Sequence, residues 1–355
     1  MSRFFSSKYS RLKAYTPGEQ PRERKYVKLN TNESPYPPSP GVIRVVAEEA
    51  ARLNLYSDPE AALLTEKCAE ILGVKPCEVL MTNGSDEILN FAFMAFSDSE
   101  HPIVFPDITY GFYPVFAELS GIPYEKIPLC EDFTINVEDY IGIGKNIVIA
   151  NPNAPTGIAL SLSDIERILA SNPDNVVIID EAYVDFGAQS AISLLSKYKN
   201  LLVTGTFSKS RSLAGARLGF GVANEELIRD LNTIKYSTNP YNVNRMTMVA
   251  GYQALVDNDY YMSNCRRVME AREYTRGELI KMGFDVTPSS ANFLFAKSEK
   301  IGGEELYLEL KSRGVLVRHF NDEKIKDYNR ITVGTKAEMD TFLLAVSEIL
   351  KEKSK

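Results

Sequence analysis

The stretch "TFSKSRSLAGARLGF", residues 206–220, places Lys209 directly after Ser208 and eight residues before Arg217. It follows the apolar run 201–205, which is typical of a buried strand. In open α/β sheets ligands bind outside the carboxyl ends of the strands, so Lys209 is expected at such a place. A lysine amine held out of water there can act as a nucleophile. Taken alone, a surface lysine in a loop would explain the same residues.

Short apolar runs alternate with longer amphipathic stretches from about residue 41 onward. The runs are rich in Val and Ile and lack polar alternation, which is typical of parallel strands covered on both faces. The predicted strands are 78–81, 103–105, 146–150, 176–180 and 201–205, with helices at 86–97, 111–120 and 162–170. This order predicts an α/β layer structure with a mostly parallel sheet.

The pattern of the chain divides it into three parts. Residues 1–40 are polar and proline-rich and are expected to form an extended arm that packs on the small domain or on a partner. Residues 41–240 form the large domain, and residues 241–355 a smaller α+β domain. The elements expected in the last part are a helical stretch at 243–282, strands at 293–296, 315–317 and 331–333, a helix at 303–313, and a final helix opened by a capping box of Thr335 and Glu338.

Composition excludes several classes of function. The 355-residue chain has a net charge of −7, so it lacks the basic face that nucleic acid requires. No run approaches the roughly 18 apolar residues of a membrane-spanning helix. The four cysteines have no CxxC spacing and only two histidines are present, so no metal site is expected. Reduced cysteines and an N-terminus without a signal-peptide pattern predict a cytoplasmic protein.

The segment "NGSDE", 83–87, lies between a predicted strand and an apolar helix that begins near Asp86. Gly84 permits a tight turn, Ser85 supplies a hydroxyl, and the first N–H groups of the helix point outward. A helix N-terminus of this kind is an anion site. The segment is neither a Walker P-loop nor a GxGxxG motif. A capped turn without a ligand is the alternative.

Asp180 ends the apolar run 176–180 and is followed closely by Tyr183. A carboxylate at the end of a buried strand is costly unless a cation meets it. A protonated pyridine nitrogen would satisfy it, since an opposite charge a few ångströms away shifts a pKa by about 1–3 units. Tyr183 could reach the same ring. A structural ion pair with an arginine or lysine is the alternative.

Two further segments follow predicted strands. "NPNAPTG", 151–157, is a rigid turn whose asparagines, Asn153 among them, can donate hydrogen bonds. "DITYGFY", 107–113, carries Tyr110, whose ring could stack on a ligand. A plain turn and a core aromatic are the alternatives. Because all these segments follow successive strands, they are expected together at one edge of one sheet.

This ordered set of segments resembles the fold-type I pyridoxal-phosphate enzymes and, within them, the aminotransferase class I/II family. The resemblance runs from "LNTNESPYPP", 29–38, to "RITVGT", 330–335. It implies pyridoxal 5'-phosphate as cofactor, with Lys209 as the catalytic residue that carries it covalently. The small residues 214–216 would let the chain pass close by. The residues implied to hold the cofactor's phosphate are Gly84, Ser85, Asp86, Ser208 and Arg217.

The resemblance also implies partners for the cofactor's ring. Asp180 would pair with the ring nitrogen and Tyr183 with the ring oxygen, and Tyr110 would stack on the ring. Tyr56 would reach into the active site of the partner subunit of a homodimer.

Within the family, the chain looks most similar to the histidinol-phosphate aminotransferases. This group implies exchange of an amino group between histidinol phosphate and 2-oxoglutarate, in histidine biosynthesis. The residues implied to bind this small anionic substrate are Tyr15, Asn32, Arg318 and Arg330. A dianion needs at least two cationic donors, and arginine suits phosphate and carboxylate alike. A threonine-phosphate decarboxylase, an aromatic amino-acid aminotransferase and a regulatory module without turnover are the alternatives.

Two positions depart from the family pattern. The asparagine that normally precedes Pro-Thr-Gly is Ala154 here, with Asn153 one residue earlier. Either Asn153 takes its place through a shifted turn, or Tyr183 alone serves the ring oxygen. Arg211 stands where small and aromatic residues are common, and it is expected to face solvent, a charge near the cofactor being the alternative.

Overall fold

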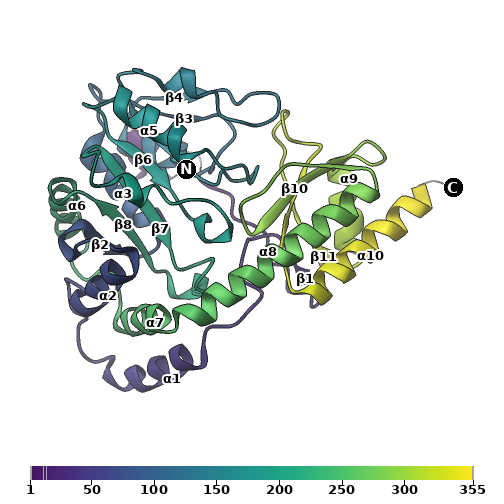
Figure 1. The fold of residues 1–355 in the computed structure, drawn as a ribbon, viewed down its shortest axis with the longest axis horizontal. Coiled ribbons are helices and arrows are strands. Elements are labelled where there is room, and N and C mark those ends of the chain that lie inside the picture. The colour runs from purple at the N-terminus through teal and green to yellow at the C-terminus, as the bar shows by residue number, and fades with distance from the viewer. Residues whose placement is uncertain (1, 11, 13, 354–355) are drawn as a thin grey trace.

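The computed structural model describes residues 2–10, 12 and 14–353. Its larger sheet has seven strands in the order β2-β8-β7-β6-β5-β3-β4, and every strand except β8 runs in the same direction (Figure 1). This sheet confirms the predicted α/β fold. The strands are β2 (Val79–Thr82), β3 (Ile103–Pro106), β4 (Tyr124–Ile127), β5 (Asn146–Ala150), β6 (Val177–Asp180), β7 (Leu201–Thr206) and β8 (Gly219–Ala223).

Helices cover both faces of this sheet. Ile178 and Leu202 pack toward α3 (Ser85–Phe96), α4 (Tyr113–Ser120) and α6 (Glu225–Thr238), whereas their neighbours Ile179 and Val203 pack toward α5 (Leu162–Ser171). Burial on both faces is the reason that the strands consist of unbroken apolar runs. The β2–β8 end is covered by α1 (Pro40–Glu49), α2 (Ala62–Leu72) and α7 (Arg245–Val256).

A second sheet of four antiparallel strands has the order β12-β13-β10-β9. Its core includes Leu294, Ile331 and Phe342. The elements are α8 (Asn258–Lys281), β9 (Phe284–Val286), β10 (Phe293–Ser298), α9 (Gly303–Ser312), β12 (Arg318–His319), β13 (Asn329–Thr332) and α10 (Lys336–Lys353). Figure 1 shows the long helix α8 running from the neighbourhood of α7 to this sheet. The division of the chain near residues 40 and 240 stays a prediction.

The N-terminal arm is tied to the second sheet by backbone hydrogen bonds. Strand β1 (Val27–Lys28) pairs in parallel with β11 (Val315–Leu316). The N–H of Leu29 then donates to the carbonyl of Leu316 at 2.7 Å, and the N–H of Thr332 donates to the carbonyl of Leu29 at 2.9 Å. These bonds fix the direction in which the following residues enter the space between the two sheets.

The predicted helical stretch at 243–282 forms two helices, α7 and α8, which meet at Asp257. The backbone of Asp257 leaves the helical conformation, with φ −85° and ψ 32°. Its carboxylate accepts hydrogen bonds from the Ser39 hydroxyl at 2.6 Å and from the Gln253 amide at 2.9 Å. These two bonds hold the Asp257 side chain at the junction of the two helices.

The capping box predicted for the final helix is confirmed. The N–H of Thr335 donates to the Glu338 carboxylate at 2.7 Å, and the N–H of Glu338 donates to the Thr335 hydroxyl at 3.3 Å. These reciprocal bonds satisfy two N–H groups that a helix start leaves unpaired, so α10 begins at Lys336.

The expectation that Arg211 faces solvent was wrong. The residue is 8% exposed, and its guanidinium donates to the side-chain oxygen of Asn258 at 2.6 Å. Its guanidinium carbon also lies 5.9 Å from the centre of the Tyr261 ring. The start of α8 therefore covers Arg211, which the local sequence alone does not reveal.

Two kinds of feature are absent from the described ranges. No cluster of three His, Cys, Asp or Glu side chains that could hold a metal ion occurs in them. Likewise, none of the helices formed by residues 2–10, 12 and 14–353 is long and apolar enough to cross a membrane.

Glu181, the residue after β6, is a buried acid held by two hydrogen bonds. It is 4% exposed, and it accepts from the Ser190 hydroxyl and the Ala191 N–H, both at 2.6 Å. Burial raises the pKa of Glu181 to about 8, although these two bonds act in the opposite direction. The folded chain therefore binds this proton more tightly than the unfolded chain does.

Glu181→Gln should remove a pH-dependent loss of stability. As pH rises from the ordinary carboxyl pKa of about 4.3 toward 8, the wild-type free energy of unfolding should fall by up to ~1.4 kcal/mol per unit from this group, because ionisation is disfavoured only in the folded state. Urea unfolding at a series of pH values measures the difference. Glu226→Gln, at an exposed position on α6, is the control and should keep the wild-type slope. An unchanged slope in Glu181→Gln would contradict this assignment.

Candidate active site

Two adjoining cavities lie at the carboxyl ends of the parallel strands. The inner one has a volume of about 190 Å³, and the outer one of about 450 Å³. Five residues line both of them: Thr31, Tyr110, Ala154, Tyr183 and Lys209. Side chains at the boundary can therefore face a group bound in either cavity.

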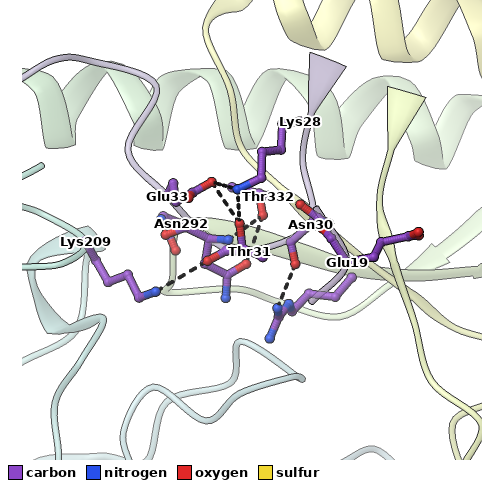
Figure 2. Close-up of polar contacts among 10 residues, drawn as sticks. Glu19, Lys28, Asn30, Thr31, Glu33, Lys209, Asn292 and Thr332 are labelled. Atoms are coloured by element: carbon purple, nitrogen blue, oxygen red, sulfur yellow. Dashed lines mark hydrogen bonds and ion pairs between the residues drawn. The ribbon is translucent and has the colours of Figure 1, made fainter. Parts of the chain in front are cut away.

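Lys209 follows β7 and reaches this boundary with its amino group. Its Nζ donates to the carbonyl of Thr31 at 3.4 Å and lies 5.9 Å from the centre of the Tyr183 ring (Figure 2). No carboxylate in the described part of the chain forms an ion pair with it. The amine is thus held by a neutral acceptor and is free to react with a group in the inner cavity.

The start of α3 and the residue Arg217 form one end of the inner cavity, together with Ser85 and Ser208. Gly84 caps the helix with φ 77°, a conformation that residues with a side chain rarely adopt. The guanidinium of Arg217 lies 2.9 Å from the Asp86 carboxylate, which also accepts from the Tyr110 hydroxyl at 2.7 Å. Helix N–H groups, hydroxyls and an arginine make this end suited to a phosphate.

Gly219 in β8 allows this end of the cavity to form. A Cβ at this position would lie 2.4 Å from the backbone carbon of Gly84 and 2.4 Å from the backbone nitrogen of Ser85. The antiparallel strand β8 therefore approaches the first turn of α3 as closely as backbones can. No local pattern of residues predicts this contact, because it depends on segments far apart in the chain.

Asp180 forms the floor of the inner cavity and is 5% exposed. It accepts hydrogen bonds from the Tyr113 hydroxyl at 2.9 Å and from the Thr204 hydroxyl at 3.3 Å. Burial raises the pKa of Asp180 to about 6, against the effect of these bonds. Within the described residues it pairs with no basic side chain, so the structural ion pair considered from sequence is absent there.

Tyr183 and Tyr110 line both cavities. The Tyr183 hydroxyl accepts from the amide nitrogen of Asn32 at 3.0 Å, and its ring meets the edge of Phe293 at 5.1 Å. The Tyr110 ring lies edge-on to Tyr113 at 5.5 Å. Burial and the nearby Asp86 carboxylate raise the pKa of Tyr110, so its hydroxyl stays protonated and acts as a donor.

Asn153 lies behind the cavity wall, and Ala154 lines the cavity instead. Asn153 is 4% exposed, and its amide group donates to the carbonyl of Ile108 at 3.0 Å and to the Thr156 hydroxyl at 3.1 Å. It also accepts from the Thr109 hydroxyl at 2.8 Å. These bonds occupy the side chain, so a contact of Asn153 with a ligand would require a different turn.

Tyr56 lies apart from both cavities in its own chain. It is 81% exposed, and its ring stacks on Tyr241 at 4.7 Å. Nothing within this single chain directs it toward Lys209. Its predicted role concerns a partner subunit and stays a prediction.

The outer cavity gathers the residues predicted to bind substrate: Tyr15, Asn32, Arg318 and Arg330. Arg330 donates to the carbonyl of Asn30 at 3.1 Å, while its Nε has no hydrogen-bond partner. Burial lowers the pKa of Arg330. A half-buried guanidinium without a carboxylate partner in the described ranges is suited to receive an anion.

Several residues in or behind the cavity walls were not singled out from sequence. Tyr113 and Thr204 hold Asp180, and Thr31 and Glu33 come from the arm. Tyr113 ends the segment "DITYGFY", 107–113, but in the sequence it looks like an ordinary core aromatic. The predicted residues of the inner cavity each lie at or after the end of a predicted strand. Thr31 and Glu33 follow no predicted strand of the sheet, so they lacked this signal.

The inner cavity matches the chemical groups of pyridoxal phosphate. It offers an anion-binding end for a phosphate, a buried carboxylate without a cation for a ring nitrogen, and a lysine amine for an aldehyde. Fold and site together define the class of fold-type I pyridoxal-phosphate enzymes.

Comparison with known proteins gives the family. Residues 24–346 match the family described as "Aminotransferase class I and II". The chain is 48% identical to the histidinol-phosphate aminotransferase of Brachyspira hyodysenteriae, over 99% of this chain and 100% of that one. It is 47% identical to histidinol-phosphate aminotransferase 2 of Burkholderia lata, with 99% and 100% covered.

A solved structure shows the same fold. The histidinol-phosphate aminotransferase of Sinorhizobium meliloti, solved in complex with pyridoxal-5'-phosphate, superimposes with a TM-score of 0.86 at 23% identity and covers 93% of this chain and 92% of that one. With the family match, these relatives establish that the chain belongs to the aminotransferase class I and II family. It is a pyridoxal-phosphate-dependent aminotransferase.

Gly219→Ala should weaken cofactor binding, because the added methyl group would push the N–H groups of the first α3 turn away from the phosphate. Loss of such charge-assisted bonds should raise the Kd for pyridoxal phosphate about tenfold. Absorbance titration of the apoenzyme measures this value. Gly277→Ala on α8 adds the same group where nothing lies within 4 Å, and it should keep the wild-type Kd. Equal Kd values for Gly219→Ala and wild type would count against the role of this turn.

Proposed function

We propose that this aminotransferase moves an amino group between histidinol phosphate and 2-oxoglutarate, as one step of histidine biosynthesis. The observation that carries the proposal is the pair of cavities that share Lys209. The inner cavity fits the cofactor, and the outer one holds Arg318 and Arg330 without carboxylate partners in the described chain. Relatives named histidinol-phosphate aminotransferase that align over 99% of the chain support it.

The residues of the inner cavity would divide the work of holding the cofactor. Pyridoxal phosphate, when bound, supplies a ring that stabilises negative charge on the carbon next to the amine. Ser85, Ser208 and Arg217 would hold the phosphate, and the amides near Gly84 and Asp86 would add N–H donors. Tyr110 would stack on the ring, and Tyr183 would donate to the ring oxygen.

Asp180 would keep the ring nitrogen protonated. Its carboxylate is buried and lacks a cation, so a pyridinium would replace an unpaired charge by a pair. This pairing would also reverse the shift of the Asp180 pKa, because a nearby positive charge favours the ionised carboxyl.

Lys209 would act as the general base and acid of the reaction. In its neutral, unbonded form, Nζ would take a proton from the substrate carbon that bears the amino group. The same nitrogen would hold that proton and give it back, so one residue would serve as both base and acid. In the second half, 2-oxoglutarate would pass through the same steps in reverse.

The outer cavity would bind the charged end of the substrate. The guanidinium of Arg330 lies 5.4 Å from the centre of the Phe293 ring and 5.8 Å from that of Phe320, and the guanidinium of Arg318 approaches the same Phe320 ring at 5.7 Å. Two arginines can neutralise a phosphate dianion with forked hydrogen bonds. Asn32 and Tyr15 would contact the part of the substrate between phosphate and amine.

We also propose a cytoplasmic homodimer in which the arm of residues 1–40, the large domain of 41–240 and the small domain of 241–355 keep their predicted roles. An exposed apolar surface on α1, α2 and α7 supports the dimer; it includes Ile43, Leu63 and Tyr252. A stable interface requires such a surface. Tyr56 stands beside it and would enter the partner's active site.

A substrate panel tests the proposed reaction. Purified enzyme loaded with cofactor is incubated with histidinol phosphate, threonine phosphate or phenylalanine, each with 2-oxoglutarate, and glutamate and CO₂ are measured. We expect histidinol phosphate to give glutamate with a kcat/KM at least about a hundredfold above phenylalanine, because only a phosphate uses both arginines, each charge-assisted bond contributing about 1.5–3 kcal/mol. Release of CO₂ from threonine phosphate should not occur.

The other outcomes select the alternatives. Release of CO₂ from threonine phosphate without glutamate would identify a decarboxylase. Faster transfer from phenylalanine than from histidinol phosphate would identify an aromatic amino-acid aminotransferase. Arg330→Met should lower kcat/KM for histidinol phosphate far more than for phenylalanine, and the exposed Arg229→Met on α6 is its matched control.

A further inference from the structure

The hydrogen bond between Lys209 and the described part of the arm is to a backbone carbonyl and not to a side chain. Nζ of Lys209 donates to the carbonyl of Thr31 at 3.4 Å (Figure 2). A carbonyl accepts a hydrogen bond from an amine in either protonation state and cannot itself be titrated. The position of this carbonyl therefore decides where the free amine of Lys209 rests.

The turn that presents this carbonyl is fixed from the side of the second sheet. Asn32 adopts the left-handed conformation, with φ 56°. Its N–H donates to the Thr332 hydroxyl at 2.9 Å, and its carbonyl accepts from the Asn292 amide at 3.0 Å. Figure 2 shows Thr332 and Asn292 near Thr31. Strain at a non-glycine residue persists where the surroundings fix it.

From the other side, a triangle of side chains fixes the same residue. The Thr31 hydroxyl donates to the Glu33 carboxylate at 2.8 Å and accepts from Nζ of Lys28 at 2.8 Å. Lys28 and Glu33 also form an ion pair with each other. All three side chains meet within hydrogen-bond distance, so the backbone of Thr31 is held by charge-assisted bonds as well as by the sheet.

Glu33 stands at the wall of the inner cavity with a negative charge. It lines that cavity together with Thr31 and Lys209. Partial burial acts to raise the pKa of Glu33, but hydrogen bonds from Lys28 and Thr31 and the charges of Lys28 and Lys209 outweigh it and lower the pKa. The carboxylate is therefore ionised near neutral pH, and its field acts on Lys209.

We propose that Glu33 is a positioning residue for Lys209: its carboxylate, through Thr31, holds the carbonyl that keeps the free lysine amine at the boundary of the two cavities. This inference rests on the proposed function, in which the amine leaves the cofactor and returns to it in each half of the reaction. An amine that wanders from this boundary would meet neither the cofactor nor the substrate carbon. Orientation of this kind contributes to rate and not to the affinity for substrate.

The test measures how fast the apoenzyme bonds pyridoxal phosphate. Stopped-flow absorbance follows covalent capture over a range of pH, and peptide mass mapping after reduction identifies the lysine. Glu33→Gln keeps the shape of the side chain and removes its charge. We expect capture on Lys209 to slow about tenfold, the effect of losing a hydrogen bond to a charged group. Thr31→Val removes the hydroxyl in the middle of the triangle and should slow capture similarly.

Glu166→Gln is the matched control. Glu166 forms an ion pair with Lys197 and accepts a hydrogen bond from the Tyr198 hydroxyl. The Glu166→Gln variant therefore loses contacts of the same kind at a place that lines neither cavity. It should capture cofactor at the wild-type rate. In steady-state turnover, Glu33→Gln should lower kcat about tenfold and leave KM for the amine within about twofold, because the arginines are untouched.

Three results separate failure of this inference from failure of the proposed function. Capture and kcat in both Glu33→Gln and Thr31→Val within about twofold of wild type would overturn the role of Glu33 and leave the function intact. A lower melting temperature of these variants without slower capture would also overturn the role of Glu33 in positioning Lys209, since it would show that Glu33 only stabilises the fold. Absence of capture on Lys209 by the wild-type apoenzyme would reject the proposed function and this inference together.

Discussion

The structure depends on the position of one amino group, Nζ of Lys209, at the boundary between two cavities. An amine at this place can bond to a group in the inner cavity and can exchange protons with a molecule in the outer one. What matters for every other group of the site is its distance and direction from this amine. In the proposed function, the start of α3 would set how far the phosphate lies from the amine, and the buried Asp180 would set where the ring nitrogen lies.

The larger sheet positions most residues of the site, and the second sheet and the arm add the rest. Parallel strands β5, β6 and β7 end side by side, so the residues that follow them share one edge. The reversed strand β8 brings Gly219 against the first turn of α3, where no side chain would fit. The arm adds Thr31, and Thr332 of the second sheet is hydrogen-bonded to its neighbours Leu29 and Asn32.

Much of this arrangement could be predicted from sequence, because burial on both faces leaves a clear pattern. The runs that became β5 and β6 contain hardly a polar residue before Asp180, so a carboxylate there stood out. Strand β8 was not predicted. Its glycines are required by close contacts with Gly84 and Ile88, which are distant in sequence, and they form no local pattern. Glu33 was missed for a similar reason, since its partners Lys28 and Thr31 carry no periodicity. Burial of Arg211 depends on α8, which lies about fifty residues further along the chain.

The central claim is that a single lysine bonds the cofactor and that its neighbours serve this bond. Reduction of the cofactor-loaded protein with borohydride, followed by proteolysis and mass mapping, tests the claim most directly, because reduction makes the bond permanent. The account predicts one pyridoxyl group per chain, on the peptide that contains Lys209. A group recovered on any other lysine, or on none, would contradict it.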